Sequence, residues 1–477
     1  MSLPTVIQGG MGAGVSRWPL ARAVSQAGQL GVVAGTALDM ILARRLEAGD
    51  PGGHMRRALA HFPIPGVAQR IIDRYFVEGG KAEADRFKPM KQMDITFTPE
   101  REELIVASNF AEVYLAKEGH DGIVGINLLE KIQLPNVASM FGAMLAGVSY
   151  VLMGAGIPKS IPGILDDLAA AKPVSLPIDV KGAERLDQFQ VHFDPQAFCQ
   201  GKVPSLTRPG FLAIVSSVTL GNVMAKKANG VVNGLIIEGS IAGGHNAPPR
   251  GVLQLTEEGE PIFGPRDEPD IAAIAKIGLP FWLAGSYASP EKIREAQAQG
   301  ATGVQIGTAF AFCHESGYDP ELKKRALAKI KAGEAHVFTD GRASPTGFPF
   351  KVFQLSGTGS DKEVFHDRQK VCDLGYLRQA YVRDNGKVGW RCASEPDKAF
   401  LKKGGDPEEI PGRKCVCNGL MANLHLGQTR PDGTIEDALM TCGADLSIVE
   451  RLLEAKGDNY TARDALEFVM GTVESPA

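Results

Sequence analysis

The stretch FWLAGSYASPEKIREAQAQGATGVQIGT, Phe281 to Thr308, holds two short apolar runs with one helix-like segment between them. Each run ends in a glycine that is followed by a residue with a hydroxyl group, and the segment between the runs spans Pro290–Gln299. Apolar runs that are nearly continuous are typical of strands buried on both faces of a parallel sheet. The stretch therefore predicts a strand–helix–strand unit.

The same order of strand, glycine and helix recurs about eight times in about the first 330 residues. Alternation of this kind indicates an α/β protein with a parallel sheet. Eight units over this length fit a closed (β/α)8 TIM barrel better than an open doubly wound sheet, which remains the alternative. The other predicted strands are TVIQGG, LGVVAG, GIVGINLL, VSYVLMG, FLAIVSS and GLIIEG, and the other predicted helices are Trp18–Ala27, Met40–Ala48, Val137–Ala146, Ile161–Ala170, Leu220–Ala228, Ile271–Ile277 and Pro320–Lys331.

Two stretches interrupt the barrel pattern, and a third follows it. Residues 51–117 hold extra helix-like segments and residues 173–209 alternate like a hairpin, so both are predicted to be insertions that form walls or lids over a site. From about residue 336 a stretch rich in Pro, Gly, Ser and Thr is typical of a long loop or linker. We therefore expect a barrel over residues 1–335 and a separate, cap-like C-terminal extension over residues 336–477, ending in helices near Asp445–Glu454 and Thr461–Met470.

The composition argues against several classes of function. Of the 477 residues, 44% are hydrophobic and 22% are charged, and the net charge of −4 is that of an ordinary globular protein. No stripe of Lys and Arg suggests nucleic-acid binding, and no apolar run reaches the roughly 18 residues of a membrane span. Seven cysteines without a visible targeting segment predict reduced thiols in the cytoplasm. Whether the chain forms a homo-oligomer stays open.

Most of the cysteines lie in the C-terminal extension. Three of them form a C-x22-C-x-C pattern, whereas a structural zinc site usually shows C-x2–4-C pairs. We therefore expect packed, reduced thiols and no metal site. The cysteines of the extension are Cys372, Cys392, Cys415, Cys417 and Cys442.

The loops after the last two predicted strands are candidates for binding phosphate. Gly285, Ser286, Gly307 and Thr308 offer bare backbone N–H groups and two hydroxyls there, and predicted helix N-termini follow them. Barrels often bind phosphate at these two loops, and a helix N-terminus favours an anion. The alternative is that these glycines only turn the chain. Because they gather at the strand ends of one barrel, phosphate binding is favoured over this alternative.

The only histidine in the stretch IIEGSIAGGHNAPPRG is the candidate for acid–base chemistry. His245 follows Gly243 and Gly244 at the end of the sixth predicted strand, and the expected phosphate site lies opposite. A loop histidine is often structural, but imidazole titrates near neutral pH and can take or give a proton. We expect His245 to be the catalytic acid or base. The chain has no G-x-S-x-G elbow for a serine nucleophile.

Together these residues resemble the nitronate monooxygenase family, formerly called 2-nitropropane dioxygenases, whose members are FMN-dependent (β/α)8 barrels. The resemblance covers about the first 330 residues. It rests on Gln-Gly-Gly-Met-Gly at residues 8–12, Asn127 in GINLL, Gly-Gly-His at residues 243–245 and Gln-Ile-Gly-Thr at residues 305–308. The resemblance implies that His245 is the catalytic base and that FMN is bound by Gly9, Gly10, Met11, Gly12, Asn127, Lys181, Glu238, Gly243, Gly244, Gly285, Ser286, Gln305, Ile306, Gly307 and Thr308.

The sequence departs from the family pattern in the loop that carries the histidine. Glu238 stands where the family usually has a flavin-contacting glutamine, and Ile241 stands where it has an acid. These changes, together with Lys181 and the prolines after His245, resemble the related FMN-dependent enoyl reductases of fatty-acid and polyunsaturated fatty-acid synthesis. The resemblance therefore implies the fold and the cofactor more closely than the substrate.

Three functions are compatible with these patterns. The first is oxidation of alkyl nitronates, and of nitroalkanes, by O2 to carbonyl compounds and nitrite. The alternative is reduction of an enoyl thioester by NAD(P)H, in which His245 donates a proton. The third, from a different class, is a protein that binds a flavin or phosphate ligand without catalysis.

Overall fold

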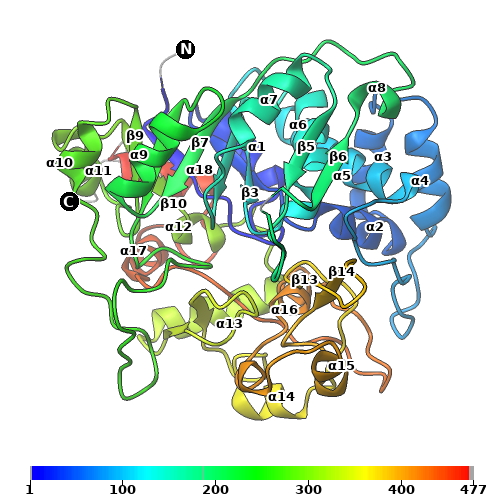
Figure 1. The fold of residues 1–477 in the computed structure, drawn as a ribbon. Coiled ribbons are helices and arrows are strands. Elements are labelled where there is room, and N and C mark those ends of the chain that lie inside the picture. Colours follow the sequence, from blue (N-terminus) through cyan, green and yellow to red (C-terminus); the bar gives the residue numbers. More distant parts are fainter. Residues whose placement is uncertain (1–2, 186, 472–477) are drawn as a thin grey trace.

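Eight parallel strands form a barrel in a computed structural model that describes residues 3–185 and 187–471 (Figure 1). The strand order is β1-β10-β9-β8-β7-β4-β3-β2, and a parallel bridge between Ile7 and Leu30 joins the first strand to the second. The predicted (β/α)8 barrel is confirmed. Its strands are β1 (Val6–Gln8), β2 (Gly31–Ala34), β3 (Val124–Leu129), β4 (Tyr150–Gly154), β7 (Gly210–Val215), β8 (Gly234–Glu238), β9 (Phe281–Ala284) and β10 (Gly303–Ile306).

The barrel interior is a packed core of side chains from alternate strand positions. Trp282 is fully buried there, and its indole N–H donates to the carbonyl oxygen of Pro4 at 2.8 Å. Filling by large apolar side chains is typical of TIM barrels, which are not pores. The buried cluster inside the barrel consists of Ile7, Leu30, Val32, Leu152, Leu212, Ile236, Trp282 and Ala284.

Four of the helices between the strands, α9, α10, α11 and α13, begin at side chains that accept hydrogen bonds from the first helical turn. Ser289 accepts from the Lys292 N–H before α11, and Asp319 accepts from Glu321 and Leu322 before α13. Proline at the first turn of both helices adds to this start signal. The helices of the strand–helix units are α1 (Trp18–Gln26), α2 (Leu38–Glu47), α6 (Gln133–Leu145), α7 (Ile161–Ala169), α9 (Val218–Lys227), α10 (Ile271–Ala275), α11 (Pro290–Ala298), α12 (Thr308–Ala311) and α13 (Pro320–Lys331).

The two interrupting stretches are structured. The first contains η1 (Pro51–Gly53), α3 (His54–Leu59), α4 (Val67–Tyr75) and α5 (Pro99–Lys117), and α5 packs against α1, α2 and α6. The second contains the antiparallel hairpin of β5 (Val174–Pro177) and β6 (Gln190–Phe193), as its alternating pattern predicts, followed by α8 (Pro195–Phe198).

The chain beyond residue 335 first leaves the barrel and then returns to it. Its last two helices pack against barrel helices, α18 against α1 and α11, and α17 against α12 and α13. The Tyr460 hydroxyl also donates to the Ala309 carbonyl oxygen at 2.7 Å. The extension therefore shares one hydrophobic core with the barrel, although its middle part lies to one side in Figure 1. Its elements are β11 (Val337–Asp340), β12 (Phe350–Phe353), α14 (Lys362–Asp367), β13 (Gln379–Val382), β14 (Val388–Arg391), α15 (Asp397–Lys402), η2 (Pro407–Glu409), α16 (Val416–Ala422), α17 (Ser447–Lys456) and α18 (Ala462–Met470).

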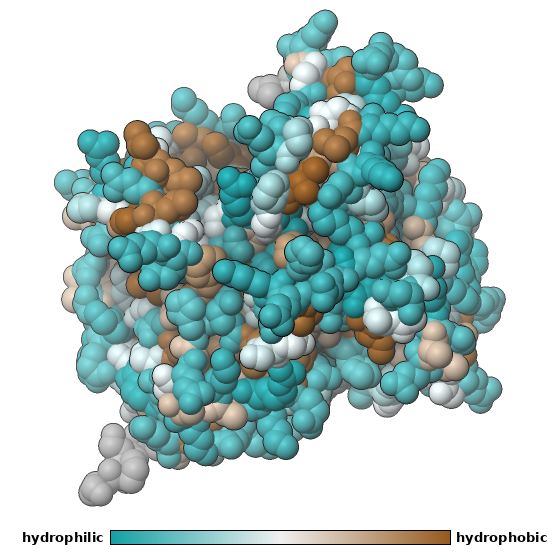
Figure 2. Space-filling model, turned by 90° about the horizontal axis from the view of Figure 1, so that it is seen from below, coloured by the Kyte–Doolittle hydropathy of each residue, from teal (hydrophilic) through white to brown (hydrophobic). Residues whose placement is uncertain are grey.

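The surface is mostly polar, with separate apolar areas. Figure 2 shows a face that is largely hydrophilic and carries a few groups of hydrophobic side chains. The loop between β8 and α10 exposes Val252, Leu253, Leu255 and Ile262. Within the described ranges, no helix has the length and hydropathy that a membrane crossing requires.

Glycine 303 is expected to be essential for barrel closure, because an added Cβ would lie 1.9 Å from the Thr5 carbonyl oxygen. That oxygen accepts the Val304 N–H at 2.9 Å, so it cannot move without loss of the β1–β10 pairing. We expect Gly303→Ala to lower the free energy of unfolding by about 3 kcal/mol. Urea unfolding measures this, with Gly264→Ala, where a Cβ meets nothing, as the control. If Gly303→Ala and Gly264→Ala were equally stable, the β1–β10 pairing that closes the barrel would be contradicted.

Candidate active site

One cavity lies at the carboxyl ends of the barrel strands, with about 230 Å³ open to water-sized molecules. Residues from all eight strands, or from the loops that follow them, line it. Almost every residue predicted for the site is among them, although their individual roles stay predictions. The cavity gathers Gly9, Gly10, Met11, Gly12, Asn127, Glu238, Gly243, Gly244, His245, Gly285, Ser286, Gln305, Ile306, Gly307 and Thr308.

Lys181 is the exception, because it does not line this cavity, and its predicted contact with the flavin stays a prediction. It follows the strand β5 of the hairpin and pairs with the C-terminal extension: its N–H donates to Ala380, and its carbonyl oxygen accepts from Val382, both at 3.0 Å. The hairpin thus holds Lys181 on the wall of a neighbouring cavity and not in the barrel mouth.

The C-terminal extension fixes the loop that carries His245. The Lys351 N–H of β12 donates to the Gly244 carbonyl oxygen, and the Asn246 N–H donates to Pro349, both at 3.0 Å. The ring of Phe350 lies 4.8 Å from the imidazole ring. The extension is therefore part of the site, which the sequence pattern of the barrel alone did not indicate.

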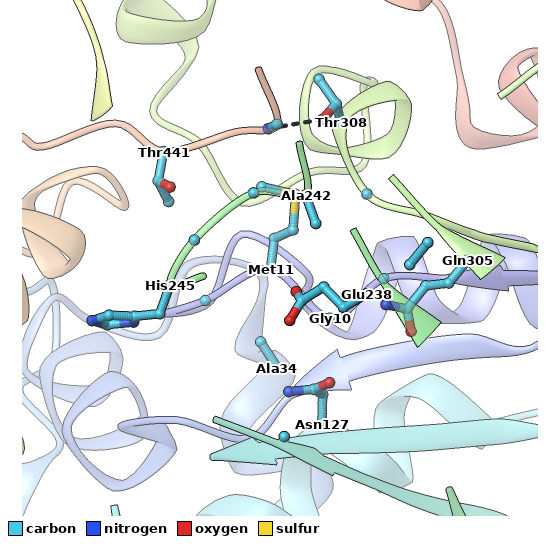
Figure 3. A pocket seen from close by; sticks show the side chains of 18 of the residues that line it. Gly10, Met11, Ala34, Asn127, Glu238, Ala242, His245, Gln305, Thr308 and Thr441 are labelled. Atoms are coloured by element: carbon cyan, nitrogen blue, oxygen red, sulfur yellow. Dashed lines mark hydrogen bonds between the residues drawn. The ribbon is translucent and has the colours of Figure 1, made fainter. Parts of the chain in front are cut away.

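His245 is held as a neutral imidazole. Its Nε2 lies 2.7 Å from the Ser344 hydroxyl oxygen. Burial, and next the positive charge of Lys131, lower the pKa of His245 well below its ordinary value. A neutral imidazole can accept a proton at neutral pH. In Figure 3, His245 and Gln305 lie at opposite ends of the cavity, and Glu238 lies between them.

Glu238 and Lys131, a lysine that sequence reasoning missed, influence each other electrostatically near the cavity. Burial raises the pKa of Glu238 to about 7, and Lys131 and Lys351 oppose this rise. Burial lowers the pKa of Lys131 to about 7, opposed by Glu238 and Glu130. The Lys131 ammonium is buried, lies 4.5 Å from the Phe348 ring and has no hydrogen-bond partner within the described residues. Its place just after β3 was the one available signal in the sequence.

The part of the cavity around Gly10 and Gln305 fits a flat ligand that carries hydrogen-bond donors and acceptors. The Gln305 Oε1 atom is buried there and has no partner in the described ranges, so a ligand N–H could satisfy it. A Cβ on Gly10 would lie 2.5 Å from the Asn127 Cβ, which shows how closely the bare backbone approaches that residue. Backbone glycines permit this approach because they lack a side chain.

The predicted phosphate loops are contacted by the segment that precedes α17. The Gly443 N–H donates to the Thr308 hydroxyl at 2.9 Å, which Figure 3 marks with a dashed line. Although burial opposes it, hydrogen bonds from Ser447 and Ser286 hold the pKa of Asp445 below its ordinary value. Lys292 and Arg451 line the same cavity as Asp445. Their positive charges are available to balance the charge of an anionic ligand there.

A model of the nitronate monooxygenase family matches residues 178–341. This segment includes β7–β10, the loop of His245 and the Gln305–Thr308 motif. The resemblance to the nitronate monooxygenase family is thereby confirmed. The matched segment contributes the carboxyl ends of β7, β8, β9 and β10 to the barrel mouth.

Curated relatives carry the same family name. A probable nitronate monooxygenase of Bacillus subtilis is 33% identical over 130 residues, which are 27% of this chain and 35% of the relative. A nitronate monooxygenase of Pseudomonas aeruginosa is 29% identical over 181 residues, 38% of this chain and 48% of the relative. The chain thus spans between a third and a half of the curated relatives that it matches.

The fold of the whole chain is found in a solved structure. The structure of FabK from Thermotoga maritima covers 98% of this chain and 92% of its own, with a TM-score of 0.50 and 15% identity. At this identity the likeness shows the fold alone and does not bear on the substrate.

Stability is expected to depend on pH through Glu238. Its pKa is about 7 in the folded chain against about 4.5 when unfolded, so stability linked to this group is full below pH 4.5 and is lost as pH rises through 7. Glu238→Gln should therefore raise the free energy of unfolding by about 1–2 kcal/mol at pH 8 and change it little near pH 4.5. Urea unfolding at both pH values tests this, with the exposed Glu257→Gln as the control. If Glu238→Gln raised the free energy of unfolding at pH 4.5 but not at pH 8, the raised pKa assigned to Glu238 would be wrong.

Proposed function

We propose that the chain is an FMN-dependent oxidoreductase that oxidises alkyl nitronates, and nitroalkanes after deprotonation, with O2. Two nitronate ions and one O2 yield two carbonyl compounds and two nitrite ions, which balances atoms and charge. The observation that carries the proposal is the half-buried His245 imidazole, which lies in the same cavity as the glycine-rich strand ends. The family match supports the same chemistry.

FMN would lie across the barrel mouth. Gly10, Asn127 and Gln305 would contact its ring, and the loops of Ser286 and Thr308 would hold its phosphate. When bound, FMN supplies the redox chemistry of its ring system. The unpartnered Gln305 oxygen and the close approach at Gly10 support this placement.

His245 would remove the α-proton of a nitroalkane. In the tautomer whose Nε2–H donates to the Ser344 hydroxyl oxygen, Nδ1 carries the lone pair that would take the proton. The electron pair of the broken C–H bond moves to the nitro group and forms the nitronate. Lys131 is close enough to His245 and Glu238 to act on the pKa of each, and its ammonium would stabilise the negative charge that develops.

The pH dependence of proton abstraction tests the role of His245. Because the pKa of His245 lies well below 6.5, the neutral base persists as pH falls. We expect the rate of nitroalkane deprotonation to stay level from pH 8 to about 6.5 and to fall only at lower pH. A rate that halves near pH 6.5 would mean that the imidazole titrates normally and is exposed to solvent.

A second candidate function is supported by the cavity next to the barrel mouth. Its volume is about 550 Å³, it shares Ile132, Tyr376 and Leu377 with the first cavity, and Lys181, Arg185 and Arg378 line it. This space suits a long anionic substrate such as an enoyl thioester, which NAD(P)H would reduce through the flavin.

The two candidates are separated by anaerobic half-reactions. Bleaching of the flavin by an alkyl nitronate, with no bleaching by NADPH, supports nitronate oxidation. Rapid bleaching by NADPH followed by reoxidation with an enoyl-CoA supports the reductase and overturns the first proposal.

A further inference from the structure

Four cysteines from three separate segments of the extension line one small cavity. Cys372 lies before Leu374, Cys392 follows β14, and Cys415 and Cys417 lie at the start of α16. None of them is in a disulfide. The same cavity is lined by Arg378. Four thiols that converge from distant parts of a chain are unusual for simple packing, because each could be replaced by a small apolar residue.

Each of the four sulfurs faces a hydrogen-bond donor. The Gln92 side-chain amide donates to Cys372 Sγ at 3.5 Å. Backbone N–H groups of Ser394, Asn418 and Leu377 donate to Cys392, Cys415 and Cys417 respectively. The Cys415 thiol also lies 3.9 Å from the Val371 carbonyl oxygen. Donors that surround sulfur stabilise thiolates and are a feature of iron–sulfur sites.

Within the described part of the chain, no group of three or more Cys, His, Asp or Glu is placed to hold a single metal ion. The four cysteines share one cavity instead, and sets of four cysteine thiolates are the ligands of polynuclear iron–sulfur clusters, in which metal and sulfide atoms fill the space between the sulfurs.

We propose that Cys372, Cys392, Cys415 and Cys417 ligate an iron–sulfur cluster. Cys417 also lines the barrel-mouth cavity, so the cluster lies one side chain away from the proposed flavin site. This proposal does not depend on the reaction that the barrel carries out.

The full chain, purified without oxygen from iron-replete cells, tests the proposal. We expect iron and acid-labile sulfide in equal amounts, and an electron paramagnetic resonance signal after dithionite reduction. Cys392→Ser and Cys415→Ser should each lower the iron content about tenfold or more. Cys199→Ser, which changes a buried cysteine outside the cavity, should keep it.

Two results would overturn the proposal. One is stoichiometric zinc in place of iron, and the other is neither iron nor sulfide after anaerobic reconstitution of the wild-type chain. If the serine variants fail to fold, as judged by circular dichroism against Cys199→Ser, the wild-type metal and sulfide analysis decides alone. Flavin content is measured in the same samples and reports separately on the proposed function.

Discussion

His245→Ala is expected to lower kcat for nitroalkane oxidation about 100- to 10,000-fold, the range that one general base contributes. The rate falls because alanine cannot accept the proton that the neutral imidazole of His245 would accept. FMN content should stay unchanged, since Gly10, Asn127 and Gln305, which would contact its ring, lie apart from His245 in Figure 3. With a preformed nitronate as substrate, the loss should be much smaller, because the proton is already removed.

Two matched variants make this result specific. His192→Ala removes an exposed histidine of β6 that bonds only Ser175 among the described contacts, and it should leave kcat unchanged. Ser344→Ala removes the partner of Nε2 and should give an intermediate loss through poor orientation of the ring. Wild-type turnover by His245→Ala with full FMN content would disprove the base assignment.

Gly10→Ala is expected to weaken FMN binding roughly 10- to 100-fold. The added methyl group would lie 2.5 Å from Asn127 Cβ and 3.2 Å from Val32 Cγ1, so the Asn127 side chain must move. Overpacking of this kind costs about 1–3 kcal/mol, and each 1.4 kcal/mol corresponds to a tenfold change in affinity. Flavin fluorescence titration of the apoprotein measures the change directly.

The control for Gly10→Ala is Gly264→Ala, where an added Cβ meets no atom within 4 Å. Thermal unfolding of both apoproteins separates a local effect on the flavin from a general loss of stability. If Gly10→Ala binds FMN as tightly as the control variant, the flavin ring does not lie against the first strand end.

The barrel could be predicted closely because each strand is a local pattern. Runs such as GLIIEG and GVQIGT are continuous, apolar and closed by glycine, which leaves few alternatives to a buried parallel strand. The candidate residues followed from topology, since parallel strands of a barrel bring their carboxyl ends to one face. Gly10 and His245 are far apart in sequence, yet both line the same cavity.

The contributions of side chains from different segments could not be predicted in the same way. Lys181 was expected near the flavin, but strand pairing with the extension holds it on the wall of the neighbouring cavity, and Lys131 is the buried cation near Glu238. The return of α18 to the barrel and the convergence of Cys372 with Cys417 depend on long-range packing. No periodicity in the sequence encodes such contacts.

The most direct measurement of the central claim is the visible spectrum of the purified chain under anaerobic conditions, before and after addition of an alkyl nitronate. The account predicts a yellow protein that releases FMN on denaturation and whose flavin absorbance is bleached by the nitronate. A protein that neither carries flavin nor binds added FMN would contradict it. So would an FMN-loaded protein whose flavin absorbance does not change with the nitronate.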